Sequence, residues 1–146
     1  MIQRIQTLFL LLAAAAAFAL FAFPFASTAQ AVESSAMFAD GLYDISDSLG
    51  LQILFCLAGI LAFVSMLLFK NRKTQLLVSR MAIVANVIGL VLAIMLFVRD
   101  RDTLGPANPD DGLGLYLPIL FLVFVLLAIR FINKDEKLVR SMDRLR

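Results

Sequence analysis

The sequence predicts an all-α integral membrane protein with four transmembrane helices in an up-and-down antiparallel bundle. Three observations lead to this fold class. First, 62% of the 146 residues are hydrophobic, against roughly 45–50% in soluble domains. Second, polar segments separate four apolar stretches of similar length. Third, the basic residues gather on one side of these stretches. The length allows a single domain over residues 1–146.

Four spans are predicted, at about residues 5–26, 51–69, 78–98 and 115–133. Each has close to the 20 residues that a helix needs to cross about 30 Å of hydrocarbon. Lipid offers no partner for free backbone groups, so each span is expected to be helical. The remaining segments are then outer loops at 27–50 and 99–114, a cytoplasmic loop at 70–77 and a cytoplasmic tail at 134–146.

The first stretch also resembles a cleavable signal peptide. Arg4 precedes an apolar run, and "STAQA" at 27–31 carries small residues where a signal peptidase could cut after Ala31. The apolar run is long for a signal peptide, which favours a retained helix, but both readings stay open. Cleavage would leave three spans with the same orientation.

Both outer loops carry local patterns. In the first, Phe38, Leu42, Ile45 and Leu49 recur at helical spacing and predict a short helix lying on the outer membrane surface. In the second, "GPANPDDG" at 105–112 predicts a tight irregular turn.

Small and polar residues inside the spans predict contacts between helices, because membrane helices associate through close van der Waals packing. The first span has a stripe of small residues at Ala15, Ala19, Ala22 and Ala26, and the second has one at Ala58, Ala62 and Ser65. Asn86 is the most polar residue well inside a span. We interpret it as an interhelical polar contact, with lining of a solute path as the alternative.

The tail has the pattern of a short cytoplasmic amphipathic helix. Asn133 followed by Glu136 resembles a helix N-cap with its reciprocating acid. Leu138, Val139, Met142 and Leu145 then fall on one face. A helix of about three turns is too short to be stable alone, so we expect it to rest on the membrane, the bundle or a partner.

The basic residues give the orientation. Of the 13 Lys and Arg, all but Arg99 and Arg101 fall on one side. Because basic residues favour the cytoplasmic side, the sequence predicts a multi-pass protein of the bacterial inner (cytoplasmic) membrane with both termini in the cytoplasm.

The composition also argues against several chemistries. The chain has no His and a single Cys, which argues against paired-histidine haem ligation, the usual histidine base and metal or iron–sulfur sites. Acidic or basic residues are missing from the middle of the spans, where ion and proton pathways place them. We therefore expect no enzyme activity, no cofactor and no metal. A net charge of +2 does not suggest nucleic-acid binding.

Four segments in order resemble one known family: "MIQRIQTLFLLLAA" at the start, "FKNRKTQ" at 69–75, Pro118 opening the last span, and the terminal "KDEKLVRSMDRLR". They are similar to the domain of unknown function 4293 family, small four-helix inner-membrane proteins of Bacteroidetes. The resemblance implies a retained first helix. It implies no activity or substrate, because the family has no assigned function.

We expect a non-enzymatic accessory, scaffold or interaction subunit that works through its cytoplasmic loop and tail, as a homo-oligomer or within a larger membrane complex. An alternative is a small oligomeric carrier or channel subunit for a neutral or apolar solute, with a path along Asn86, Ser65 and Gln52. A third possibility is binding of anionic lipid headgroups in the cytoplasmic leaflet of the bilayer. The predicted interaction surface comprises Lys70, Arg72, Lys73, Lys137, Leu138, Arg140, Met142, Arg144 and Leu145.

Overall fold

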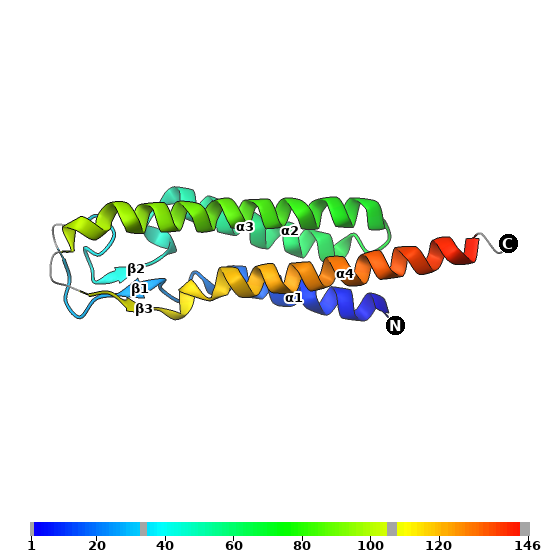
Figure 1. The fold of residues 1–146 in the computed structure, drawn as a ribbon, viewed down its shortest axis with the longest axis horizontal. Helices are drawn as coiled ribbons and strands as arrows, with labels where there is room; N and C mark the ends of the chain where they lie inside the picture. Colours follow the sequence, from blue (N-terminus) through cyan, green and yellow to red (C-terminus); the bar gives the residue numbers. More distant parts are fainter. Residues whose placement is uncertain (1, 33–34, 105–107, 144–146) are drawn as a thin grey trace.

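The computed structural model describes residues 2–32, 35–104 and 108–143, with the side chains of all of these except residues 2–4, 138 and 140–143. The described chain is mostly helical. Its long helices are α1 (Ile2–Ala19), α2 (Leu49–Leu67), α3 (Arg72–Asp100) and α4 (Leu117–Asp143). Figure 1 shows them side by side along one axis. In this arrangement α1 packs against α2 and α4, and α3 packs against the same two helices.

The two ends of the molecule differ. One end, the sheet end, carries the strands β1 (Ala26–Ser27), β2 (Leu42–Tyr43) and β3 (Asp110–Asp111). The other, the tail end, brings together the start of α1, the connection between α2 and α3, and the end of α4 (Figure 1). This division locates the polar surfaces of the protein.

The first helix ends at Ala19, well before the predicted limit at residue 26. Pro24 has no N–H to donate and its ring clashes with the carbonyl four residues earlier, so a helix cannot pass through it without a kink. The chain tightens into a turn, with hydrogen bonds from Phe21 N to Phe18 O and from Ala22 N to Ala19 O. It then continues as extended chain into β1.

The first outer loop forms part of a small sheet, and the predicted surface helix is wrong. β1 is the central strand and pairs antiparallel with β2 on one side and β3 on the other. Phe38 and Ile45 are buried, whereas Leu42 and Leu49 are exposed. The four residues at helical spacing therefore do not lie on one face of a helix. Three 3-10 turns, η1 (Ile45–Asp47), η2 (Arg101–Thr103) and η3 (Leu113–Leu115), complete this end.

The interior consists of two apolar clusters. Between the helices, small side chains of α1, α2 and α3 pack around Phe121 and Val125 of α4. Nearer the sheet end the rings of Phe25, Phe38 and Tyr43 pack together. The predicted stripe of α2 is confirmed, since its three members are buried.

The predicted stripe of the first span is mostly wrong. Ala15 and Ala22 are exposed, Ala19 is half-buried, and only Ala26 is buried. The alanines of α1 that face the interior are Ala13, Ala14, Ala16 and Ala17. In an almost uniformly apolar helix, spacing alone does not select the packed face.

The third and fourth helices extend beyond the predicted spans at the tail end. α3 begins at Arg72, so most of the predicted loop at 70–77 is helical. α4 runs without interruption to Asp143, and the separate C-terminal helix is therefore a correction: the tail is the last part of α4. Figure 1 shows this part projecting beyond the other helices.

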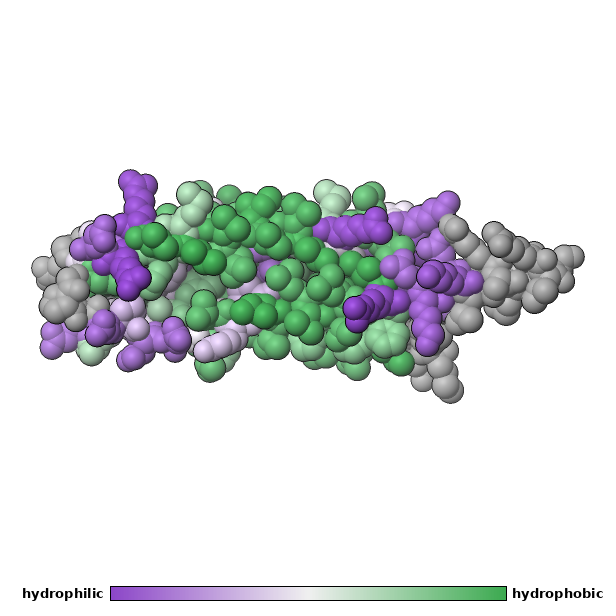
Figure 2. Space-filling model, viewed as in Figure 1, coloured by the Kyte–Doolittle hydropathy of each residue, from purple (hydrophilic) through white to green (hydrophobic). Residues whose placement is uncertain are grey.

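Within the described residues, three helical segments are by length and composition suited to crossing a membrane: Leu49–Leu67, Arg72–Thr103 and Leu113–Lys137. The apolar helix Ile5–Ala19 is shorter. Figure 2 shows an apolar surface over the middle of the molecule with hydrophilic residues towards both ends.

Candidate functional site

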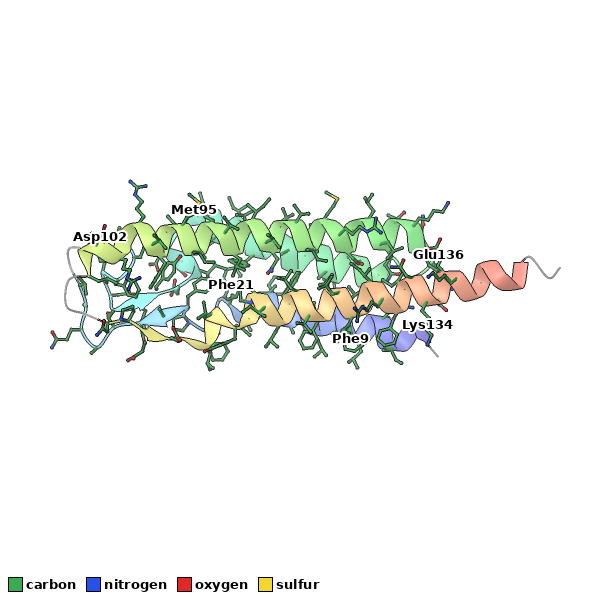
Figure 3. The ribbon with its side chains drawn as sticks, viewed as in Figure 1. Phe9, Phe21, Met95, Asp102, Lys134 and Glu136 are labelled. Atoms are coloured by element: carbon green, nitrogen blue, oxygen red, sulfur yellow. The ribbon has the colours of Figure 1, made fainter. Side chains whose placement is uncertain are left out.

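The tail end joins the basic loop to the fourth helix. The Arg72 guanidinium forms a salt bridge of 2.9 Å with the Asp135 carboxylate. A shallow pocket of about 510 Å³ lies beside this bridge, lined by Lys70, Lys73, Glu136 and their neighbours Phe69, Asn71 and Arg72. We call these residues, with Asp135 and Lys137, the loop–tail surface. In Figure 3, Glu136 lies where α4 passes the start of α3.

The geometry of the loop–tail surface follows from local structure. Asn71 is the N-cap of α3, and its side-chain oxygen accepts a hydrogen bond of 3.3 Å from Thr74 N. Lys70, Lys73 and Lys137 are exposed, and Arg72 is half-buried. The surface therefore offers exposed cations beside two carboxylates, which suits a partner with charges of both signs better than a simple anion.

The structure locates only part of the predicted tail surface. Leu138, Arg140 and Met142 belong to α4, but their side chains lie outside the described part. Arg144 and Leu145 lie outside the described residues. The helical backbone places Leu138 and Met142 on one face, because they are four residues apart.

Asn86 lies in the interior of α3, fully buried. Its side-chain amide donates a hydrogen bond of 3.2 Å to the backbone carbonyl of Pro118, in the first turn of α4. A backbone carbonyl oxygen has two lone pairs, so the Pro118 carbonyl can accept this bond besides one from its own helix. The contact joins α3 to α4.

Sequence reasoning missed a polar cluster in the interior near the tail end. Gln75 falls in the predicted cytoplasmic loop at 70–77, yet its side chain is only 1% exposed. Among the described residues, neither its amide nitrogen nor its amide oxygen has a hydrogen-bond partner. The Ser65 hydroxyl donates to the Gln75 backbone carbonyl at 3.1 Å and lies 2.7 Å from the Ser79 hydroxyl. Helix α3 begins earlier than expected, which carries Gln75 inside.

Another missed feature is a pocket of about 150 Å³ at the sheet end. Four buried residues form its floor: Phe25, Ala26, Tyr43 and Ala93. Its sides come from α3, from the turn before α4 and from β3: Leu90, Ile94, Phe97, Pro109, Asp111 and Leu115. The residues are far apart in sequence, so no local pattern could have revealed the pocket.

Tyr43 anchors the floor of this pocket. Its hydroxyl donates a hydrogen bond of 2.8 Å to the carbonyl of Ala93. Burial, followed by the charges of Asp47 and Asp100, raises the pKa of Tyr43 above its ordinary value, so it stays a protonated donor at neutral pH. The Tyr43 hydroxyl therefore has a structural role.

Acidic side chains surround the sheet end and hold its turns. Asp44 accepts a hydrogen bond from Ser46 N at 2.6 Å, and Asp47 accepts one from Asp44 N at 2.7 Å. The Asp100 carboxylate accepts hydrogen bonds from the Ser35 hydroxyl and from Met37 N. Within the described ranges, no group of three His, Cys, Asp or Glu residues is placed to hold a metal ion.

Fold and surfaces together define a class: a small α-helical protein with helices suited to crossing a membrane. A family model described as a domain of unknown function, DUF4293, matches residues 2–145. The chain belongs to this family. No curated protein and no solved structure matches it.

Proposed function

We propose that the chain is an integral protein of the bacterial inner membrane whose four helices form an antiparallel transmembrane bundle. Large apolar side chains are exposed along every helix, among them Leu8 of α1, Ile53 of α2, Val84 of α3 and Ile119 of α4. Contiguous apolar surface of this extent is not stable in water. A hydrocarbon layer supplies the missing contacts.

The first helix belongs to this membrane unit. Helix α1 contributes four alanines to the interior, and β1 is the central strand of the sheet. Cleavage after Ala31 would remove both elements, so the retained helix is favoured over the signal peptide.

The tail end faces the cytoplasm in this proposal, because in the sequence all the basic residues except Arg99 and Arg101 fall on that side of the predicted spans. The protein then acts as a non-enzymatic accessory or scaffold subunit that binds another membrane protein or a second copy through the loop–tail surface. The observation that carries this role is the continuity of α4 past the other helices, with the Arg72–Asp135 salt bridge joining its base to the loop. A continuous charged helix of this kind would hold a bound partner in a fixed position relative to the other helices.

The experiment is an affinity purification from native membranes in mild detergent. One variant removes residues 138–146 and keeps Asp135, and a second combines Lys70→Ala with Lys73→Ala. Both should lose the co-purifying partners or the oligomer of the full chain. Arg101→Ala, an exposed basic residue at the sheet end, is the matched control and should keep them. Unchanged partners and oligomer size in both variants would refute the proposed role.

The carrier alternative has weaker support. Asn86 and Ser65 are engaged in hydrogen bonds inside the protein, and Gln52 donates to Ser46 O at the sheet end. None of the three lines the two pockets described above. Solute flux into reconstituted vesicles that Asn86→Leu abolishes would favour transport over the accessory role.

A further inference from the structure

The pocket at the sheet end has the form of a lateral groove beside α3. Leu90, Ile94 and Phe97 follow one face of the helix over two turns, a length of about 10 Å at 1.5 Å per residue. The floor is buried, whereas Ile94 is 52% exposed. The groove is therefore open towards the side that the membrane would cover.

In the proposed membrane setting, the position of the groove along α3 corresponds to the outer edge of the hydrocarbon layer. Arg99 to Asp102 begin two residues after Phe97 and carry alternating charges, which places them at the headgroups. Leu90 then lies within the hydrocarbon. An elongated apolar groove that starts at the headgroups and descends into the bilayer has the shape of a single acyl chain.

A carboxylate lines the same groove on the side nearest to the headgroups. Asp111 belongs to the exposed strand β3 and lines the pocket. In the described part of the chain its carboxylate has no ion-pair partner. The other residue of β3, Asp110, is acidic too, so a ligand with an ammonium group is favoured here over one with a net negative headgroup.

We propose that this groove binds one phosphatidylethanolamine molecule of the outer leaflet. One acyl chain occupies the space between Leu90, Ile94 and Phe97, and the primary ammonium of the headgroup pairs with Asp111. The inference rests on the membrane setting proposed above. The partner purification does not involve the groove, so either proposal can fail alone.

The test is native mass spectrometry of the full chain in detergent with equal amounts of phosphatidylethanolamine and phosphatidylglycerol. We expect one retained phosphatidylethanolamine per chain, preferred about fivefold, the ratio expected from one interfacial charge pair. Ile94→Trp should fill the groove and remove the retained lipid. Ile88→Trp makes the same change on another exposed position of α3, 51% exposed and outside the pocket, and should keep it.

Asp111→Asn separates the headgroup contact from the chain contact. The residue is exposed, so the variant should fold, retain one lipid and lose the preference between the two headgroups. Equal retention of both lipids by the unaltered protein would overturn the proposal. So would an Ile94→Trp variant, folded by circular dichroism, that retains as much lipid as Ile88→Trp.

Discussion

At the scale of single residues, two glycines lie where the backbone of another segment approaches closely. Gly112 N donates to Phe25 O at 2.9 Å and Gly114 N donates to Pro24 O at 2.8 Å. A Cβ on Gly114 would lie 2.5 Å from Phe23 O and 2.6 Å from Pro24 O. These backbone oxygens cannot move away from an added Cβ without breaking the hydrogen bonds of the sheet.

Gly114→Ala should therefore destabilise the protein by about 1–3 kcal/mol, the usual cost of overpacking. Thermal unfolding in detergent followed by circular dichroism measures this. Gly50→Ala is the control, because its Cβ would meet side-chain atoms alone: the end of the flexible Leu92 side chain at 3.0 Å and the Ser48 hydroxyl oxygen at 3.5 Å. A Gly114→Ala midpoint equal to that of Gly50→Ala would contradict the approach seen here.

Asp47 makes stability depend on pH. Burial raises its pKa to about 6; the hydrogen bond from Asp44 N opposes this, and the charges of Asp44, Asp40 and Asp100 add to it. Between the unfolded value of 3.8 and about 6 the folded protein binds the extra proton, so stability falls as pH rises through this window. We expect the thermal midpoint to decrease across it and Asp47→Asn to flatten the decrease. An unchanged slope in that variant would refute the assignment.

Gln75 and Asn86 should respond in opposite directions to replacement by Leu. Gln75→Leu removes a buried amide without a described partner and should stabilise the protein by about 1 kcal/mol or more. Asn86→Leu breaks the bond to Pro118 and should destabilise by about 0.6–1.7 kcal/mol, the range measured for membrane helices. Unfolding in denaturing detergent gives both values. A destabilised Gln75→Leu variant would contradict the first expectation.

At the scale of elements, the sequence located all four helices but misplaced several ends. Hydropathy depends on composition and reports where a helix can lie in lipid, whereas helix ends depend on capping and on local breakers. Pro24 ends the first helix early, although Phe25 and Ala26 beyond it are equally apolar. The loop–tail residues were found because charges stand out in an apolar chain. The sheet, the groove and the burial of Gln75 arise from contacts distant in sequence.

The sheet also explains how non-helical chain can adjoin a membrane. Lipid cannot satisfy free backbone groups, so such chain must find partners in the protein. After Pro24, the Phe25 N–H donates to Tyr43 O at 2.7 Å, and the carbonyls of Pro24 and Phe25 accept bonds from Gly114 and Gly112. The extended chain that follows the short first helix therefore finds hydrogen-bond partners for its backbone within the protein.

Two asparagines show how capping is decided. Asn133 was predicted as an N-cap, but the preceding residues Arg130 to Ile132 include no breaker, and the helix continues through it. Asn71 follows a turn and does cap α3. Asn71→Ala should cost about 0.5–2 kcal/mol, whereas Asn133→Ala, inside a helix, should be neutral or slightly stabilising. Thermal midpoints of the two variants check this, and equal losses would contradict it.

At the scale of the whole molecule, the distribution of polarity joins the fold to the proposed role. The apolar middle in Figure 2 lies between an acidic sheet end and a basic tail end. Because basic residues favour the cytoplasmic side of a bilayer, such a charge distribution favours a single orientation with the tail end inside. In the proposed orientation the loop–tail surface would face the cytoplasm and the lateral groove would face the outer leaflet.

The most direct test of this account is site-directed labelling in intact cells with a membrane-impermeant maleimide. In a Cys56→Ser background, single cysteines replace the exposed residues Asp110 at the sheet end and Lys137 at the tail end. We predict that position 110 reacts once the outer membrane is permeable, and that position 137 reacts only after the inner membrane is opened. Labelling of position 137 in cells with an intact inner membrane would contradict the orientation and, with it, the proposed function.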